Sequence, residues 1–488
     1  MAGVLETAIR SSVLWGVTKV ARFNRSRLPM PDVPHPFLSG IHAPMTDERT
    51  LTNLVVIGTI PPALDGRYLR IGPNPVRPNP AAHHWFTGDG MVHGIAIKDG
   101  RALWYRNRWI RSKAVGAALG RPPAPGPRHG LNDTVNTNVV GIAGRTWALV
   151  EAGSTPVELS DDLDEQAYNS FDNTLAGSFT AHPHRDPLTG EHHAVAYEAT
   201  NQDTVRHVVL SPDGRVVREA VIGVRHGPSV HDCAITARYA IILDLPVTFS
   251  MRTLIDGHPF PYTWNPAHQA RVGLLPRHGA DADIIWCNVD PCYVFHIANA
   301  YDTEDGRVIL DVIAYATMFA ESLKGPDGTS RGLERWTLDP VSRSVHRRTV
   351  DASPQEFPRI DERRFGLPYR YAYATALPKD RDAQTVSDTR LFKHDLHDGT
   401  RTVHEFGAGR IPGEFVFVPA YADADEDEGW LIGLVIDRGT DTTDLVIIDA
   451  RDFAGEPPAR IRIPHRVPPG FHGNWLQTSL GAEQLVPA

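Results

Sequence analysis

Short runs in which apolar and polar residues alternate, each closed by turn-forming residues, fill most of this 488-residue sequence. Such runs predict strands, because successive side chains of a strand point to opposite faces of its sheet. The clearest runs are residues 146–151, 193–198, 205–210, 215–222, 239–245, 307–315, 430–436 and 444–449. Asp213-Gly214 and Asp398-Gly399 each separate two runs and favour tight hairpin turns. The pattern predicts an all-β fold of consecutive strand pairs, a propeller or a large barrel.

Glycine and proline support this interpretation, since 41 and 40 of them are spread along the whole chain. Frequent turn formers favour many short strands over a few long helices. No strict sequence repeat is present, so the residues alone do not give a number of blades. Residues 113–130 break the strand pattern with four prolines, which predicts a surface loop or a lid-like insert.

The N-terminal segment has a different periodicity. Apolar residues recur near helical spacing with basic residues between or after them: Leu5, Ile9, Val13, Val17 and Val20, against Arg10, Lys19, Arg22, Arg25 and Arg27. We predict an amphipathic segment over residues 1–35, followed by a single domain over 36–488. The helix either packs on the body of the protein or lies on anionic lipid, as a peripheral membrane contact. The segment lacks the uninterrupted apolar centre and cleavage site of a secretory signal.

Charge and cysteine content narrow the class of protein. A net charge of -9 disfavours a nucleic-acid-binding role, which usually needs a basic face. The three cysteines, Cys233, Cys287 and Cys292, form no CxxC pair and match neither a disulfide framework nor a thiolate metal site. A reducing, cytoplasmic setting fits this composition.

Four of the 23 histidines share a context that metal binding would require. His182, His231, His296 and His472 each lie at or just after an apolar or aromatic stretch, which places each near the end of a buried strand. Imidazole suits Fe, Zn, Cu and Ni. A single buried histidine is more often an ordinary hydrogen-bonded residue, and the four spacings follow no local motif. The residues alone therefore leave both interpretations open.

Other metal or nucleophile motifs are weaker. His184-Arg185-Asp186 could supply two arms of a two-histidine, one-carboxylate site, or could be a polar turn before Pro187. The sequence contains no HExxH or GxxxxGK[ST] motif.

Three glutamates lie beside apolar runs, where an unpaired carboxylate is costly. They are Glu151, Glu356 and Glu414. A metal-bound histidine usually donates its second ring N–H to a carboxylate, so these residues are candidate partners of the histidines. The alternative for each is a surface position on an edge strand.

Together these residues belong to a series of motifs in a recognisable order. They are the segments 64–75, 85–94, 105–109, 181–183, 355–358, 413–414 and 469–475, the last reading Pro-Gly-Phe-His-Gly-Asn-Trp. From about residue 40 to 480 the chain resembles the carotenoid cleavage oxygenase family, and is especially similar to bacterial, mycobacterial-type members.

The resemblance implies a seven-bladed β-propeller with iron on the axis and a cap of loops and helix over a substrate tunnel. It implies that His182, His231, His296 and His472 bind Fe(2+). Glu151, Glu356 and Glu414 would orient His231, His296 and His472 respectively, leaving His182 without a carboxylate. Thr137 would crowd one open metal position and Phe295 would line the pocket. His184 matches no ligand of the family.

The resemblance also implies the reaction, in which O2 and an apolar polyene react to give two carbonyl products. Carotenoids and apocarotenoids are the expected substrates. Stilbene-cleaving relatives carry a lysine directly before the first of the three glutamates, and here that residue is Val150. Val150 therefore favours a carotenoid over a phenolic stilbene. A stilbene-cleaving oxygenase and a propeller that binds without catalysis are the alternatives.

Overall fold

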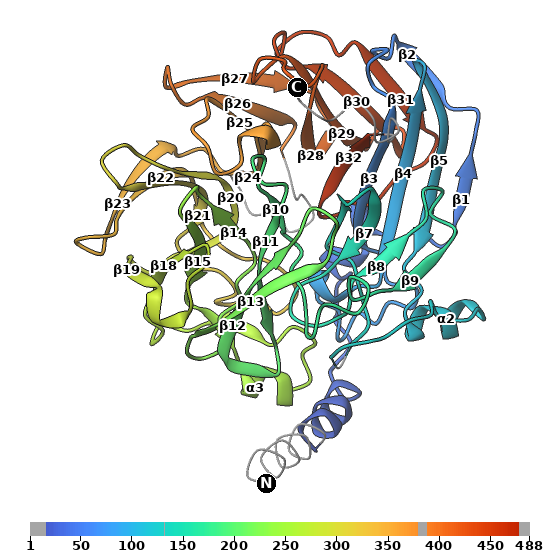
Figure 1. Ribbon diagram of the computed structural model, residues 1–488. Coiled ribbons are helices and arrows are strands. Elements are labelled where there is room, and N and C mark those ends of the chain that lie inside the picture. Colours follow the sequence, from blue (N-terminus) through green and yellow to red (C-terminus); the bar gives the residue numbers. More distant parts are fainter. Residues whose placement is uncertain (1–15, 131, 379–387, 478–488) are drawn as a thin grey trace.

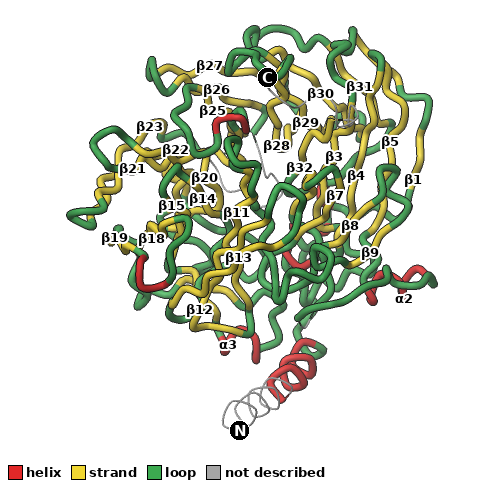
Figure 2. The backbone as a smooth tube through the Cα atoms, viewed as in Figure 1, coloured by secondary structure: helices red, strands yellow, loops and turns green. Residues whose placement is uncertain are grey.

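The computed structural model describes residues 16–130, 132–378 and 388–477, and it has an all-β fold (Figure 1). Its sheets are arranged around a common centre like the blades of a propeller (Figure 2). The predicted all-β, propeller-like architecture is confirmed. Residues 5–13 of the predicted amphipathic pattern lie outside the described residues, and residues 16–25 are helical.

Two five-stranded sheets combine the first strands of the chain with the last ones. One has the order β1 (Arg49–Leu51), β5 (Arg101–Trp109), β4 (Gly90–Lys98), β3 (Gly66–Pro73) and β32 (Gly473–Gln477). The other has the order β2 (Val55–Gly58), β31 (Ala459–Ile463), β30 (Thr442–Asp449), β29 (Gly429–Asp437) and β28 (Arg410–Pro419). Because β32 pairs with β3 and β2 pairs with β31, early and late strands share both sheets and close the ring.

Three four-stranded sheets are formed by strands in sequence order. They contain β6 (Asn138–Ile142), β7 (Arg145–Leu149), β8 (Val157–Leu159) and β9 (Gln166–Tyr168); β10 (His184–Arg185), β11 (His192–Glu198), β12 (Asn201–Leu210) and β13 (Val216–Gly223); and β24 (Gln355–Arg359), β25 (Tyr371–Ala376), β26 (Arg390–Asp395) and β27 (Thr400–Glu405). Both predicted hairpin turns, at Asp213-Gly214 and Asp398-Gly399, join neighbouring strands of these sheets.

The remaining strands form one eight-stranded sheet and a small two-stranded one. The large sheet has the order β14 (Cys233–Ile235), β15 (Tyr239–Asp244), β18 (Arg271–Pro276), β19 (Ile285–Asn288), β23 (Ser344–Asp351), β22 (Ser330–Asp339), β21 (Val308–Tyr315) and β20 (Tyr293–Asp302). The small sheet pairs β16 (Val247–Phe249) with β17 (Tyr262–Trp264). The short 3-10 helices are η1 (Pro36–Leu38), η2 (Gly40–His42), η3 (Trp85–Thr87), η4 (Asp281–Asp283) and η5 (Glu362–Arg364).

Burial along the strands explains why the sequence alternates in some places and not in others. All eight residues of β21 are buried, because neighbouring sheets cover both of its faces, and its sequence is accordingly a nearly continuous apolar run. The outer strand β13 alternates between buried and exposed residues, with Val217 and Val221 more than half exposed. Inner strands therefore supply the core and outer strands the surface.

The segment 113–130 differs in part from the predicted loop. Helix α2 (Lys113–Leu119) begins after Ser112, whose hydroxyl accepts a hydrogen bond from the N–H of Val115, and ends at Gly120 with a φ of 65°. A polar N-cap, an alanine-rich interior and a left-handed glycine end define a short helix despite the nearby prolines. The proline-rich residues that follow lie in irregular backbone, as predicted.

Candidate metal centre

Four segments from different parts of the propeller carry the candidate ligands to its centre. His182, His231 and His472 lie just before β10, β14 and β32, and His296 lies within β20. All four residues are buried, with at most 8% of their surface exposed. The loop bearing His472 is held against β3, because the carbonyl of His472 accepts the N–H of Ile71 at 3.0 Å. At this crossing a Cβ on Gly72 would lie 2.4 Å from Gly470, so two glycines permit the approach.

The four imidazoles present their Nε2 atoms to one point. The Nε2 of His231 lies 3.1 Å from those of both His182 and His296, and the Nε2 of His296 lies 3.1 Å from that of His472. One ligand atom from each residue lies within 4.8 Å of all the others. With metal–nitrogen bonds of about 2.1 Å, neighbouring ligands are about 3.0 Å apart in an octahedron and about 3.4 Å apart in a tetrahedron. The observed spacing fits the first arrangement better.

Three of these histidines are hydrogen bonded to a carboxylate through Nδ1, the other ring nitrogen. Nδ1 of His231 lies 2.8 Å from Glu151, and Nδ1 of His296 lies 2.5 Å from Glu356. Nδ1 of His472 lies 3.1 Å from Glu414. Among the described residues, His182 has no carboxylate at hydrogen-bonding distance. The structure thus brings the residues together in the pairs that the resemblance implied.

The hydrogen bonds that Glu151, Glu356 and Glu414 accept from three of the histidines indicate whether the site fits a metal ion. A neutral imidazole that donates its Nδ1 proton to a carboxylate keeps a bare lone pair on Nε2. The lone pair of His296 then faces those of His231 and His472 at 3.1 Å, an arrangement that repels unless a cation lies between them. The four histidines therefore fit a metal ion bound through nitrogen.

The charge state of the histidines follows their surroundings. Burial lowers the pKa of His182 well below its usual value, and the neighbouring histidines lower it further. Burial also lowers the pKa of His472, and together with the neighbouring histidines it outweighs the opposing effect of Glu414. Burial lowers the pKa of His296 too, but the charge and hydrogen bond of Glu356, with the charges of Asp232 and Glu414, together raise it. Burial alone would raise the pKa of Glu414, but His472 and Arg359 lower it to about 2, so this carboxylate is an anion at neutral pH.

Irregular strand pairing aims three of these side chains. Two residues of β20, Phe295 and His296, lie opposite one residue of β21, and similar bulges occur in β24 after Glu356 and in β28 at Glu414. Within the second bulge Phe357 has a φ of 55°, which is strained for an aromatic residue. Bulges re-aim side chains next to active sites, so this is where the regular alternation of the sequence fails.

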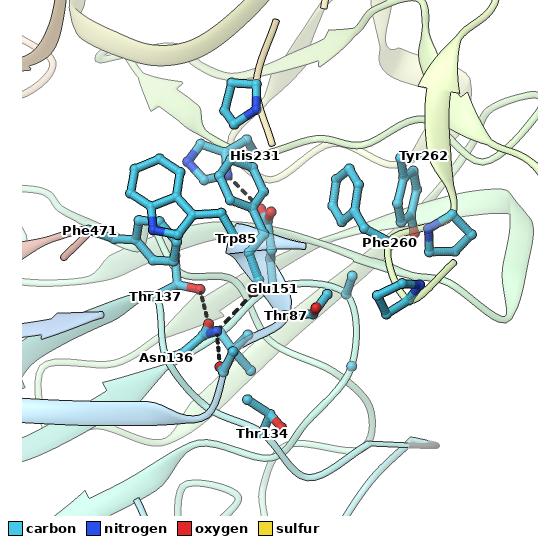
Figure 3. Close-up of a pocket in the computed structure, with 18 of the residues that line it drawn as sticks. Trp85, Thr87, Thr134, Asn136, Thr137, Glu151, His231, Phe260, Tyr262 and Phe471 are labelled. Carbon is cyan, nitrogen blue, oxygen red and sulfur yellow. Dashed lines mark hydrogen bonds and ion pairs between the residues drawn. The ribbon is translucent and has the colours of Figure 1, made fainter. Parts of the chain in front are cut away.

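A cavity of about 1200 Å³ leads to the metal centre, and its walls include His231, His296 and His472. Aromatic side chains dominate the approach, and the labelled ones in Figure 3 include Trp85, Phe260, Tyr262 and Phe471. Phe295 and Val150, the two predicted pocket residues, both line this cavity. The Phe295 ring is buried and lies 5.4 Å from the His231 ring and 5.9 Å from the Phe319 ring. The cavity suits a large, apolar ligand.

Thr137 also lines the cavity and is buried. Its hydroxyl donates to the side-chain oxygen of Asn136 at 2.9 Å, as Figure 3 shows, and its carbonyl accepts the N–H of His472 at 3.2 Å. Asn136 in turn donates to the carbonyl oxygens of Phe86 and Gly88 at 2.9 and 2.7 Å. Since the hydroxyl is engaged, the methyl group is the remaining branch of Thr137.

The alternative site at His184-Arg185-Asp186 does not assemble. The Asp186 carboxylate pairs with Arg277 and accepts the N–H of Leu188 at 2.8 Å. His184 instead donates to Asp232 at 2.7 Å. The two side chains have separate partners and do not form a metal site with His182.

Several wall residues were missed by the sequence analysis. Tyr315 lines the cavity and donates its hydroxyl proton to Glu356 at 3.1 Å. Phe260 and Tyr262 also line the cavity, on segments with no distinguishing motif, and Phe319 packs against Phe260 with 4.9 Å between ring centroids. Trp85, Phe86 and Phe471 could have been found, because they lie inside the motifs 85–94 and 469–475.

Fold and site together define a metal-dependent protein with an all-β, propeller-like body and four histidines at the end of an aromatic cavity. The family described as retinal pigment epithelial membrane protein matches residues 42–477. The chain belongs to this family, which includes the carotenoid cleavage oxygenases.

Similar proteins include a carotenoid cleavage oxygenase of Mycobacterium tuberculosis, 42% identical over 91% of this chain and 98% of the relative. The carotenoid 9,10(9',10')-cleavage dioxygenase 1 of Arabidopsis thaliana is 33% identical over 93% of this chain and 92% of its own length. Among solved structures, the lignostilbene dioxygenase of Pseudomonas brassicacearum has a TM-score of 0.82 at 28% identity, covering 92% and 99% of the two chains. The cobalt-substituted apocarotenoid oxygenase of Synechocystis has a TM-score of 0.80 at 27% identity, covering 91% and 99%.

Proposed function

We propose that this chain is an Fe(2+)-dependent dioxygenase that cleaves a carbon–carbon double bond of a carotenoid or apocarotenoid into two carbonyl products. The observation that carries the proposal is the set of four buried histidines, three of them paired with carboxylates, at the end of the large aromatic cavity. Both oxygen atoms of O2 enter the products, one in each carbonyl group, so the reaction needs no further reductant.

His182, His231, His296 and His472 would hold the iron, which when bound supplies the chemistry for activating O2. Glu151, Glu356 and Glu414 fix the tautomer of three ligands and offset part of the metal's positive charge. Thr137 restricts the space beside the metal with its methyl group. No described side chain is needed as a general base, because the overall reaction moves no proton. The cavity walls position the polyene and exclude water from it.

We propose that the sheets make up seven blades with the iron on their common axis. The eight-stranded sheet divides into β14-β15-β18-β19 and β20-β21-β22-β23, whose outer strands meet through the parallel pair of Asn288 and Ser344. Each half has the four-stranded form of a blade. With the five sheets of four or five strands, the two halves give seven blades in a single domain over residues 36–488.

The test is a substrate panel given to protein reconstituted with Fe(2+). We expect apocarotenals and carotenoids to be cleaved, with two carbonyl products identified by mass spectrometry. We expect a 4-hydroxystilbene to react at least about tenfold more slowly, because Val150 offers the phenol no charge or hydrogen bond. The likeness to the lignostilbene dioxygenase favours the opposite outcome, so faster cleavage of the stilbene would assign the chain to that activity. Failure to bind iron or consume O2 would indicate a non-catalytic binding protein.

We also propose a cytoplasmic enzyme that touches a membrane at the opening of its cavity. Val20 and Phe23 of the N-terminal helix and Met30 after it are 47–66% exposed, and Thr18, Ala21, Arg22 and Arg25 line the cavity. Figure 1 shows this helix projecting from the body near α3 (Met251–Ile255). Asn24 donates a hydrogen bond to the carbonyl of Ile255 at the end of α3, and Arg25 donates to the carbonyl of Gly257 just after it. Among the described residues, no helix is long and apolar enough to cross a bilayer.

We expect the double variant Phe23→Ser and Met30→Ser to float several-fold less with anionic lipid vesicles than the unmodified chain, because exposed apolar and basic residues bind such surfaces. The control is Val341→Ser, which removes an apolar side chain that is 93% exposed in the turn between β22 and β23. Equal flotation of all three proteins would contradict the membrane contact.

A further inference from the structure

A buried carboxylate beside the metal centre joins three of the ligand-bearing segments. Asp232 directly follows His231 and is 4% exposed. Its Oδ1 accepts hydrogen bonds from His184 Nε2 and from the N–H of Cys233, both at 2.7 Å. Its Oδ2 accepts the N–H of Ile297 at 2.9 Å. His184 lies two residues after His182, and Ile297 lies directly after His296, so one side chain connects all three segments.

The contact with Ile297 falls at the bulge that aims His296. Two residues of β20, Phe295 and His296, lie opposite one residue of β21, and pairing resumes at Ile297. The N–H of Ile297 donates to Asp232, and a buried backbone donor without such a partner would cost about 1–3 kcal/mol. The carboxylate therefore stabilises the irregular backbone that places the imidazole of His296.

His184 and Asp232 lie next to the metal ligands but outside the substrate cavity. Neither His184 nor Asp232 is among the residues that line the cavity. The His184 ring packs edge-on against Phe365, with 4.8 Å between ring centroids. These residues cannot touch the substrate there, so any effect they have on the reaction passes through the metal ligands.

A second metal site at this place is disfavoured, although His184, Asp232 and Cys233 each have a ligand atom within 4.8 Å of the others. The Asp232 oxygens already accept three N–H donors. Burial, together with Asp232, raises the pKa of the Cys233 thiol well above its usual value, so the sulfur stays protonated beside the His182 carbonyl. His184, Asp232 and Cys233 therefore form a hydrogen-bonded cluster that supports the metal ligands.

We propose that Asp232 and His184 are positioning residues that set the spacing of His182, His231 and His296 and thereby the affinity of the centre for Fe(2+). The inference rests on the proposed function only in that the four histidines bind iron. Outer hydrogen-bonding partners of metal ligands typically change metal affinity by 10–100-fold, and we expect an effect of this size.

The experiment measures Fe(2+) binding to the full chain by anaerobic titration against a competing chelator, and the visible spectrum of the cobalt(II) form. In Asp232→Asn, the new NH2 group must face an N–H donor in place of an acceptor oxygen. We expect Fe(2+) affinity to fall about 10–100-fold and the cobalt spectrum to change. The matched control is Asp244→Asn, since Asp244 is fully buried and accepts from His268 at 2.8 Å away from the centre. It should lower the melting temperature only.

A second pair of variants covers the case in which Asp232→Asn does not fold. His184→Leu removes the donor to Asp232, whereas His184→Gln keeps an N–H that can donate. Weaker iron binding in the leucine variant with recovery in the glutamine variant would support the inference. Unchanged affinity and spectrum in Asp232→Asn, or equal affinities of the two His184 variants, would overturn it. An unmodified chain that binds no Fe(2+) would overturn the proposed function itself, a result distinct from these.

Discussion

His231→Ala is expected to abolish iron binding and to reduce polyene cleavage at least about a thousandfold, because the metal contributes several kcal/mol of stabilisation to the transition state. The Nε2 of His231 lies 3.1 Å from the Nε2 atoms of both His182 and His296, so its removal opens the middle of the set. Glu151 loses its partner, but its side chain is 13% exposed and lines the cavity, where water can solvate it. The fold should therefore survive.

Iron content after anaerobic loading and gel filtration, with the melting temperature, measures this prediction. His268→Ala is the matched control, because His268 is equally buried and donates to a carboxylate, Asp244, at 2.8 Å away from the centre. It should keep its iron while losing stability. One equivalent of iron in His231→Ala would contradict the proposed ligand set.

Much of the fold was accessible from the sequence because strand periodicity is a local property. Adjacent residues were enough to predict two strand pairs, β12 with β13 and β26 with β27, and the Asp-Gly turn that joins each pair. The helix α2 was missed because prolines a few residues later dominated the segment's composition. The number of blades depends on how distant strands pair, which local patterns do not contain.

The candidate site was accessible only in part, for a related reason. Four apolar contexts suggested His182, His231, His296 and His472, but consecutive members of the set are 49, 65 and 176 positions apart. Only the family motifs identified these four histidines as one set of metal ligands. The role of Asp232 had no signal at all, since it depends on a bulge 65 residues away that leaves a backbone N–H to be satisfied. Such irregular backbone breaks the rules on which sequence analysis depends.

Glu356→Gln, a substitution outside the ligands, is expected to lower iron affinity about 10–100-fold with a comparable loss of kcat/KM. Glu356 makes the shortest carboxylate contact of the three, 2.5 Å to His296, and also accepts the Tyr315 hydroxyl and the N–H of Phe357. A glutamine oxygen can still accept from Nδ1 and from Phe357, but the neutral amide no longer offsets the positive charge of the metal. It also stabilises the hydrogen bond that fixes the His296 tautomer less than a carboxylate does.

The control for this substitution is Glu334→Gln, since Glu334 is equally buried and pairs with Arg347 and Trp336 outside the centre. It should lower the melting temperature without changing iron affinity. Glu151→Gln should have a smaller effect than Glu356→Gln, because Glu151 is partly exposed to the cavity and water can replace its contact with His231. If the Glu356→Gln protein bound iron as tightly as the unmodified chain, tautomer control by this carboxylate would be wrong. The histidines alone would then account for the affinity of the centre.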